Sequence, residues 1–216
     1  MPKKGSAIFL VYADLADPSL EAEFNDWYSN EHIPQLLGLP GFLDAARYKA
    51  VSGGPAYLAA YELESPDAIH RPEFTNRPHS ERDDRLSPTV IGKNVTRILG
   101  SQIYPSGPEN PDRGMAPVLQ IGRMSVTEDQ DADWNAWYNG TYIPGYRTVP
   151  GVIYARRFKV LEGERRYTTV YEFEHEKVPE SPEWNHLRIN GSPLNVPMRE
   201  IMDMAPGSPG VYRKIT

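Results

Sequence analysis

The feature that most constrains the fold of this chain is an internal repeat. Residues 24–64 align without a gap with residues 134–174, at a shift of 110, and 15 of the 41 positions are identical. Chance at ordinary composition gives roughly two or three. The same shift sets residues 8–11 opposite 118–121. The chain therefore contains two copies of one unit. The identical positions of the first copy are 25, 27, 28, 33, 34, 40, 41, 45, 47, 49, 53, 57, 61, 62 and 64.

Each copy is expected to have the same order of elements. A helix is predicted at 19–32, where apolar side chains recur at three- and four-residue spacing. Pro34 should end it at His32, because proline cannot continue a helix interior. A second helical segment, at 67–84, contains two prolines and should be short or broken. Strands are predicted at 7–13, 42–51, 57–63 and 94–103. The order β-α-β-β-α-β defines a ferredoxin-like unit, so the fold class is α+β.

The two units are expected to complete each other. One such unit leaves an apolar sheet face bare, and the second copy can cover it, with one cavity in each half between sheet and helices. We expect an N-terminal half at 1–104, which holds the active cavity, and a C-terminal half at 117–216 with a degenerate motif. Residues 105–116, rich in proline and glycine, should link them. The prediction is two tandem ferredoxin-like repeats that form one barrel within one chain.

Composition excludes several classes of function. The net formal charge is −6 and long basic runs are missing, which disfavours nucleic acid and membranes as partners. The chain has no cysteine, and its five histidines lack metal-ligand spacing, so no metal is expected. Without a phosphate-binding loop, a dinucleotide fingerprint or a nucleophile elbow, no nucleotide cofactor or serine hydrolase is expected either. Because membrane-spanning and signal-peptide patterns are also missing, a cytoplasmic location is expected.

A local motif adds a family resemblance. Residues 27–34 read Trp-Tyr-Ser-Asn-Glu-His-Ile-Pro, and they precede Pro40-Gly41-Phe42 and Arg47-Tyr48. This motif resembles the EthD-like branch of the dimeric α/β-barrel superfamily, in which such a helix leads into such a strand. The resemblance implies an intramolecular dimeric α/β-barrel for this chain. It leaves the reaction open, because relatives of the barrel include cofactor-independent monooxygenases, polyketide cyclases, isomerases, lyases, decarboxylases and haem proteins.

His32 is the leading catalytic candidate because the copies differ there. Glu31-His32 of the first copy becomes Thr141-Tyr142 in the second, while the surrounding residues persist. Imidazole is a natural general base near neutral pH, and Tyr28 lies four residues earlier on the same helix face. Glu31 is a weaker candidate for orienting His32, because adjacent helical side chains point apart. The alternative is that His32 is a helix-end residue that caps carbonyl groups.

Contacts with the substrate are expected from Trp27, Arg47, Tyr57, Tyr61, His79 and Tyr142. Each has a structural alternative. Trp27 recurs in the second copy, as core packing would require, and the tyrosines fit either a cavity wall or a core. Arg47 could clamp a carboxylate or phenolate, or pair with Glu62 across the hairpin. His79 lies in the proline- and charge-rich stretch 70–85, which could fold over the cavity as a lid.

These residues predict an enzyme without cofactor that acts on a small, apolar, aromatic or polyketide-like compound. His32 would take a proton while tyrosines hold the substrate oxygens, so the reaction would be of lyase, isomerase, cyclase or decarboxylase type, in aromatic compound catabolism. Oxygen insertion by a cofactorless monooxygenase is the nearest rival. The remaining alternatives are a non-catalytic barrel that binds a small molecule and a barrel that binds haem through His32. A homodimer of the pseudo-dimeric chain is the expected assembly.

Overall fold

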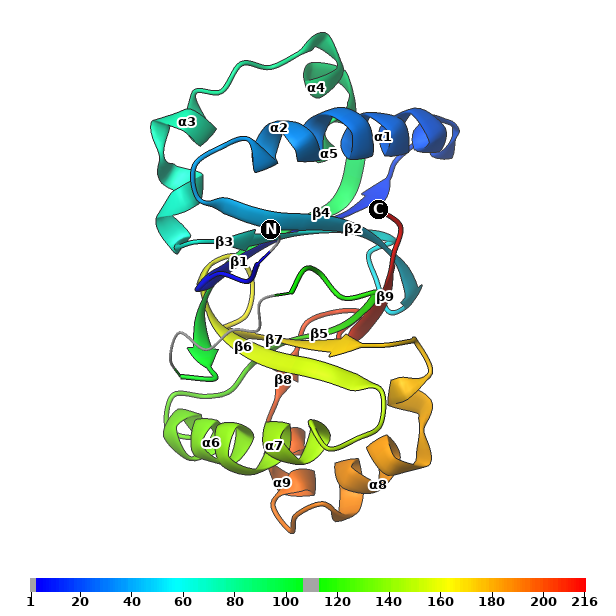
Figure 1. The fold of residues 1–216 in the computed structure, drawn as a ribbon. Helices are drawn as coiled ribbons and strands as arrows, with labels where there is room; N and C mark the ends of the chain where they lie inside the picture. The colour runs from blue at the N-terminus through cyan, green and yellow to red at the C-terminus, as the bar shows by residue number, and fades with distance from the viewer. Residues whose placement is uncertain (1–2, 107–112) are drawn as a thin grey trace.

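The computed structural model describes residues 3–106 and 113–216, and the two copies share one succession of elements (Figure 1). The first copy contains the strands β1 (Ala7–Leu15), β2 (Phe42–Ser52), β3 (Tyr57–Leu63) and β4 (Gly92–Tyr104) and the helices α1 (Glu21–Trp27), α2 (Ile33–Leu37), α3 (Pro72–Thr75), α4 (Glu81–Leu86) and α5 (Pro88–Ile91). The second contains β5 (Val118–Ser125), β6 (Val152–Glu162), β7 (Tyr167–Phe173), β8 (Asp203–Met204) and β9 (Gly210–Lys214), with α6 (Asp131–Trp137), α7 (Ile143–Tyr146), α8 (Pro182–Asn190) and α9 (Asn195–Glu200). The predicted α+β class is confirmed.

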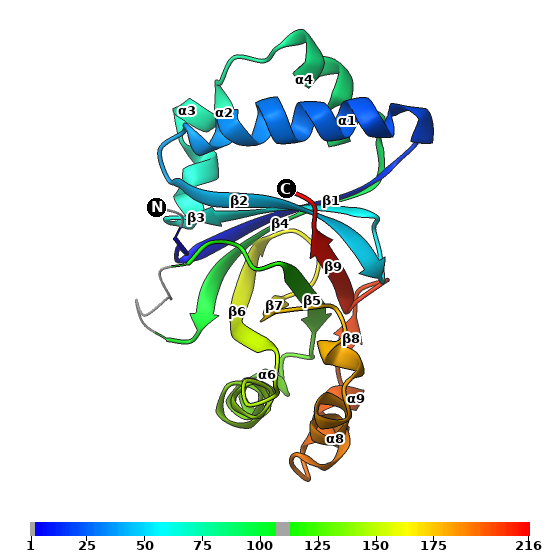
Figure 2. The ribbon, with the colours of Figure 1, turned by 45° about the vertical axis from the view of Figure 1, so that its right-hand side comes forward.

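Eight strands form one closed antiparallel barrel. Their order is β7-β6-β4-β1-β3-β2-β9-β5, and β5 pairs with β7 to close the ring, while the short β8 extends β5 alone. Closure leaves no free edge among these eight strands. Figures 1 and 2 show the helices of the first copy on one side of the barrel and those of the second copy on the other. None of the helices in the described residues is long and apolar enough to cross a membrane.

The copies are joined at two equivalent seams. At one seam β2 pairs with β9, and at the other β6 pairs with β4. In each case the second strand of one copy meets the last strand of the other, which gives the barrel a pseudo-twofold relation. Of the linker expected at 105–116, residues 107–112 lie outside the described residues, whereas β4 ends at Tyr104 and β5 begins at Val118.

Strand alternation divides the apolar side chains between the barrel interior and two cores under the helices. In β1, Phe9 and Val11 belong to the core under α1, whereas Leu10 and Tyr12 belong to the barrel interior. Because both faces are buried, β1 reads as a nearly continuous apolar run in the sequence. Each large apolar side chain that is removed from water contributes roughly 1.5–3 kcal/mol to folding.

Four charged side chains are also buried inside the barrel: Lys4, Glu62, Arg156 and Glu172, each at most 2 % exposed. Lys4 Nζ lies 2.7 Å from Glu172 Oε1, and Arg156 Nη1 donates to Glu62 Oε2 at 3.0 Å. The two carboxylates occupy equivalent positions of the repeat, but each cation comes from one copy alone. The four charges balance, as charges removed from water must.

The pairing of β1 and β5 corrects the repeat alignment in the first strand. Ala7 pairs with Leu63, and Val118 pairs with Phe173, the residue equivalent to Leu63. Ala7 and Val118 are therefore equivalent, at a shift of 111, and the alignment of 8–11 with 118–121 was wrong by one residue. The error matters because a one-residue slip exchanges the two faces of a strand. Phe9 corresponds to Gln120.

The predicted helix end at His32 was also wrong. The chain passes from α1 through a π-helical turn, Tyr28–His32, directly into α2, and the Ile33 N–H donates to the Tyr28 carbonyl. Pro34 falls in the first turn of α2, where its missing N–H is tolerated. The second copy repeats this turn at Tyr138–Tyr142. The other helical segment, expected to be short or broken, is divided into α3, α4 and α5.

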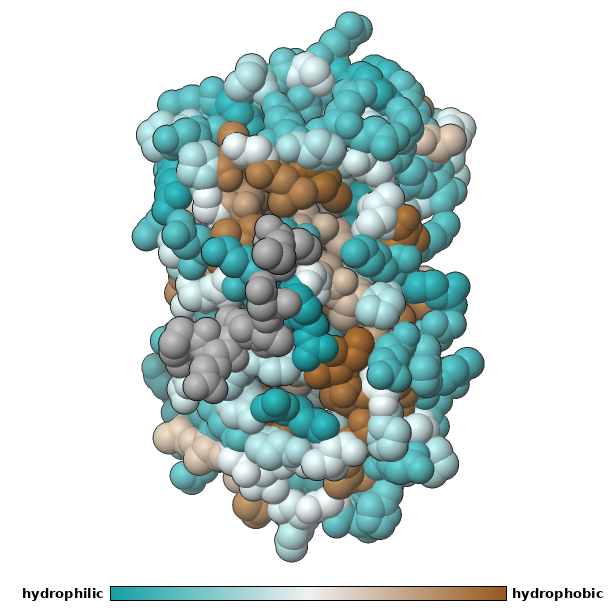
Figure 3. Space-filling model, in the orientation of Figure 1, coloured by the Kyte–Doolittle hydropathy of each residue, from teal (hydrophilic) through white to brown (hydrophobic). Residues whose placement is uncertain are grey.

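The surface seen in Figure 3 is mostly hydrophilic over the two helical ends of the molecule. Hydrophobic residues gather instead along the middle, beneath the upper helices and over the barrel. Polar outer faces are what helices that cover a sheet should present to water.

Candidate active site

A cavity of about 550 Å³ lies in the N-terminal half between the sheet and the helical segment 66–91. Apolar side chains form much of its wall: Phe9, Val11, Leu36, Ile69, Phe74, Pro88, Val90 and Leu99. Polar side chains that line it include Tyr28, His32, Tyr61, Arg77, His79, Asp83 and Arg97. The cavity thus combines an apolar wall with phenols, an imidazole and cations, a composition typical of small-molecule sites.

His32 is held in the cavity wall by aromatic contacts, and its buried Nδ1 lies beside Asp83 without a hydrogen bond to it. Its ring lies 4.8 Å from the Trp27 ring and 5.0 Å from the Tyr28 ring, in the latter case edge to face. Its Nδ1 lies 3.5 Å from Asp83 Oδ1, and the His32 side chain is 13 % exposed. Because Nδ1 faces the carboxylate, Nε2 is the nitrogen left to meet a ligand.

Asp83 is itself held at the start of α4. Its backbone N–H donates to Ser80 Oγ, and its Oδ2 accepts from the Ser80 N–H at 2.7 Å, a capping box. Its Oδ1 also accepts from Trp27 Nε1 at 3.2 Å. Burial raises the pKa of Asp83, but hydrogen bonds with Ser80 and the interaction with His32 together outweigh it, and the net pKa is lowered. A carboxylate that is ionised and fixed therefore stands next to His32.

Burial lowers the pKa of His32 to about 4, because desolvation of the imidazolium outweighs the attraction of Asp83. The ring is therefore neutral at neutral pH, and its free nitrogen carries a lone pair. Arg77 and His79 act in the same direction as burial. A neutral imidazole can accept a proton, and the charge that results would be stabilised by Asp83.

Two tyrosines face each other beside His32. The Tyr61 hydroxyl donates to the Tyr28 hydroxyl at 3.2 Å, and both residues are buried. Burial raises the pKa of both, further for Tyr61, while nearby Arg47 works against the rise. Both are neutral phenols at neutral pH, and because Tyr61 gives its proton to Tyr28, the Tyr28 hydroxyl is the one that can donate a hydrogen bond to an oxygen of a ligand.

Arg77 and Arg97 bring two cations to the cavity wall, which the carboxylates of Asp83, Asp84 and Glu162 also line. Burial lowers the pKa of Arg77; the attraction of Asp83 opposes this, and the smaller repulsion of Arg97 adds to it. Arg77 Nη1 donates to the Phe74 carbonyl at 2.7 Å, and its guanidinium lies over the Phe74 ring. Neither arginine forms an ion pair with a carboxylate of the described residues. Both are available to an anionic ligand.

The other candidates from the sequence lie outside this cavity. Glu31 is exposed and forms an ion pair with Arg82, away from His32. Trp27 is fully buried behind His32 as a core residue that also supports Asp83. The Tyr57 hydroxyl donates to Glu21 at the edge of α1. None of the three lines the cavity.

Arg47 is buried beneath α1 and does not reach the cavity. Its guanidinium lies over the rings of Phe24, Tyr28 and Tyr57, and its Nη1 donates to Ser29 Oγ at 3.3 Å. The pairing with Glu62 that was considered is wrong. Arg47 is paired with Ala59 on the face toward the helices, whereas Glu62 lies on the opposite face of the sheet.

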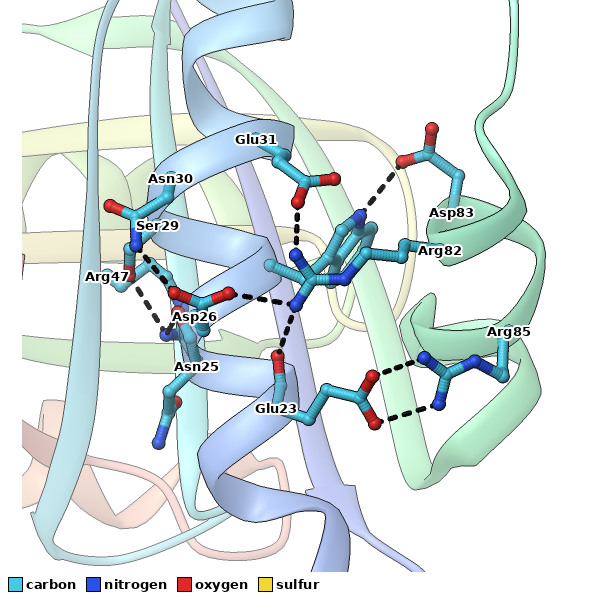
Figure 4. A network of polar contacts seen from close by, with 11 residues as sticks. Glu23, Asn25, Asp26, Ser29, Asn30, Glu31, Arg47, Arg82, Asp83 and Arg85 are labelled. Carbon is cyan, nitrogen blue, oxygen red and sulfur yellow. Dashed lines mark hydrogen bonds and ion pairs between the residues drawn. The ribbon is translucent and has the colours of Figure 1, made fainter.

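The stretch expected to act as a lid does cover the cavity and is tied down to α1. Arg82 bridges Asp26, at 2.9 Å, and Glu31, while Arg85 pairs with Glu23 (Figure 4). His79, also in this stretch, lines the cavity but is half exposed, with Nδ1 3.4 Å from Asp84.

Asp83, Arg77 and Arg97 were missed as site residues by the sequence analysis. Ser80 and Asp83 form a capping-box pattern that could have located the start of α4, but no local signal links it to His32. Arg97 precedes Leu99 on β4 by two residues, so alternation alone places both on the face toward the helices.

The second copy encloses a cavity of similar size, about 590 Å³. Tyr142, the substrate-binding candidate that replaces His32, lines this second cavity and not the first. Its ring packs at 4.5 Å from Trp137 and 4.6 Å from Tyr146. Burial is the main reason that its pKa is raised, so it stays neutral.

Comparison with known proteins places the fold. Residues 7–80 match the model of a family described as a domain of unknown function (DUF4286). A comparison with curated protein sequences gives no match. An anthrone oxidase-like protein superposes with a TM-score of 0.64 at 12 % identity, covering 97 % of this chain and 91 % of the other.

Two further solved structures cover both halves. A candidate monooxygenase from Fusobacterium nucleatum subsp. nucleatum superposes with a TM-score of 0.63 at 7 % identity. The match covers 98 % of this chain and 94 % of the other chain. A heme-binding protein from Thermus thermophilus superposes with a TM-score of 0.58 at 12 % identity, and the match covers 100 % of this chain and 95 % of the other chain. None of them distinguishes the EthD-like branch, which stays a prediction. The neighbours are dimeric α/β-barrel proteins, and this chain has their fold with both barrel halves in one polypeptide.

Proposed function

We propose that the N-terminal cavity is the active site of a cofactor-independent enzyme that takes a proton from a small aromatic or polyketide-like compound. The observation that supports this most directly is the position of His32, whose Nδ1 faces the fixed carboxylate of Asp83 beside the cavity. A base needs a free lone pair, a fixed orientation and a partner for its developing charge. The ring contacts of His32, its neutral form and the nearby Asp83 carboxylate support this role.

In the proposed step, Nε2 of His32 removes a proton from a carbon that an adjacent carbonyl acidifies. The electron pair of the broken C–H bond moves to the carbonyl oxygen and gives an enolate. A hydrogen bond from Tyr28, whose hydroxyl accepts from Tyr61, would hold that oxygen, and the cations Arg77 and Arg97 in the cavity wall would help to stabilise its charge. Proton return to a second carbon completes an isomerisation, and loss of a leaving group completes an elimination.

Exchange of α-protons in 2-tetralone, an aromatic ketone, tests this step before the natural substrate is identified. The measurement is deuterium uptake from D₂O followed by NMR. We expect His32→Ala to slow the protein-catalysed exchange by at least about a hundredfold, because a positioned base contributes about 10²–10⁴. Tyr142→Phe, at the equivalent position of the second copy, is the matched control and should leave the rate unchanged. Equal rates in His32→Ala and wild type would place the base elsewhere.

Reaction of the same anion with dioxygen is the second candidate. The neighbours described as anthrone oxidase-like and as a candidate monooxygenase support it. Deprotonation by His32 would come first in this case too, and the electron-rich anion would then react with oxygen. Oxygen consumption with anthrone as the probe separates the candidates, because isomerisation and elimination consume none.

Binding of haem is the alternative that the heme-binding neighbour raises. In the cavity, His32 is a residue that could serve as an axial ligand. Its Nδ1 lies beside Asp83, so its Nε2 would be the nitrogen that meets the iron. Mixing the protein with hemin and recording the Soret band tests this directly. A band that shifts in wild type and not in His32→Ala would favour haem binding over the proton-transfer role.

A further inference from the structure

The second cavity differs from the first in chemistry, although the two have the same scaffold. With the corrected alignment, His32 corresponds to Tyr142, Leu36 to Tyr146, Ala59 to Thr169 and Phe9 to Gln120. All four residues of the second copy line its cavity. The second cavity has thus lost the imidazole and gained three hydroxyl groups and an amide.

Three of these four polar groups are buried without a hydrogen-bond partner among the described residues: Gln120 Oε1, Tyr146 Oη and Thr169 Oγ1. Gln120 is 8 % exposed. The side chain lies on the face of β5 that carries Val118 and Met124 toward the helices. A buried acceptor of this kind costs free energy unless a ligand or water satisfies it.

The wall around it is suited to a flat apolar body. Tyr146 and Tyr171 pack on Trp184 at ring distances of 4.1 and 5.1 Å. Met124 and Met202 line the same cavity, and thioethers adapt to aromatic rings. Aromatic and thioether side chains together favour a planar ligand.

Two cations stand at this cavity without a counter-ion. Arg188 from α8 and Arg199 from α9 both line it, and neither forms an ion pair with a carboxylate of the described residues. Glu176 and Glu180, which also line the cavity, are paired with Arg213 and Lys177. Arg199 interacts with the neutral Tyr142 hydroxyl, so both arginines keep a positive charge that no carboxylate of the described residues neutralises, and the guanidinium has the matching geometry for a carboxylate.

We infer that the C-terminal cavity is a second, non-catalytic binding site for an aromatic carboxylate. The ring system would pack against Trp184 and the tyrosines, the carboxylate would bind Arg199 and Arg188, and a donor group on the ring would reach Gln120. The site has no group that titrates near neutral pH at the position of His32, because Tyr142 stays neutral there. The inference does not rest on the proposed reaction.

Methionine methyl groups offer a readout specific to this cavity. Met124, Met202 and Met204 line it, whereas none of the methionines within residues 3–106 and 113–216 lines the N-terminal cavity. In protein labelled with ¹³C at the methionine methyls, addition of 2-naphthoate should shift the NMR signals of these three methyls in a saturable way. Met→Leu substitutions assign each signal to its residue. The uncharged 2-naphthamide should bind at least about tenfold more weakly, because a hydrogen bond to a charged group is lost.

Arg199→Gln should weaken 2-naphthoate binding at these methyls by about tenfold or more. Arg97→Gln, the matched removal of a cation from the N-terminal cavity, should leave them unaffected, and so should His32→Ala. Near-UV circular dichroism checks that the variants are folded. Methyl signals that do not respond to 2-naphthoate would overturn the inference, and so would equal affinity of wild type and Arg199→Gln. Failure of the exchange assay with 2-tetralone would leave it standing.

Discussion

At the scale of single residues, the N-terminal cavity depends on how one histidine is held. Trp27 supports both the His32 ring and the Asp83 carboxylate, so a residue that reads as plain core also sets the geometry of the candidate base. Burial keeps His32 neutral, and Asp83 favours its protonated form. The two effects oppose each other, and burial is the larger.

The depressed pKa of His32 predicts a pH-dependent stability. Between pH 6.5 and about 4 the unfolded chain binds a proton at this residue that the folded protein does not. The free energy of unfolding should therefore fall as the pH falls through that window, by up to about 3 kcal/mol from this residue. His32→Gln should flatten the dependence, measured by urea unfolding at pH 7, 5.5 and 4. Parallel curves for both proteins would contradict a depressed pKa.

At the scale of elements, the π-helical turn and the lid bring the site together. The turn allows the helix to continue through Pro34, and it carries both Tyr28 and His32 at its ends. The segment that contains α4 supplies Asp83 to the site, and ion pairs from Arg82 and Arg85 tie that segment to α1. Such pairs are exposed, so they tether the lid weakly.

Arg82→Ala should loosen the lid without unfolding the barrel. The substitution removes the contacts to Asp26 and Glu31, so amide hydrogen exchange in α4 should become a few-fold faster, while exchange in the strands stays unchanged. Lys177→Ala, which removes an exposed ion pair with Glu180 in the other half, is the control and should not affect α4. Identical exchange of α4 in the two variants would show that Arg82 does not hold the lid.

At the scale of the whole molecule, the four charges inside the barrel link the copies. Arg156 of the second copy pairs with Glu62 of the first, and Lys4 of the first pairs with Glu172 of the second. A buried charge without its partner is costly, so these contacts penalise any arrangement in which the halves are apart.

Lys4→Met should destabilise the protein by about 3 kcal/mol, because it leaves a buried carboxylate poorly compensated. Lys3→Met, at the exposed neighbouring residue, is the matched control and should have little effect in urea unfolding. The double variant Lys4→Met with Glu172→Leu should recover much of the loss, because it removes the unpaired charge. If Lys4→Met were as stable as Lys3→Met, the four buried charges would contribute little to the stability of the protein.

The sequence by itself determined that two α+β units lie in tandem, because strand and helix periodicities and turn residues act locally and the repeat shows them twice. It also singled out His32, through the difference between the copies at that position. Local patterns could not set the exact strand register, since β1 (Ala7–Leu15) is one residue longer than β5 (Val118–Ser125). Nor could they foresee that a π-helical turn would accommodate Pro34.

Only the tertiary structure decided what surrounds His32. Asp83 lies 51 positions further along the chain, and Arg97 further still, so their approach depends on how α4 and β4 pack on the first helix. Closure of the barrel through β2–β9 and β4–β6 likewise joins strands of different copies. The physical reason is the same throughout: hydrogen bonding and side-chain periodicity along the chain fix each element, whereas burial and charge compensation between distant elements fix their arrangement.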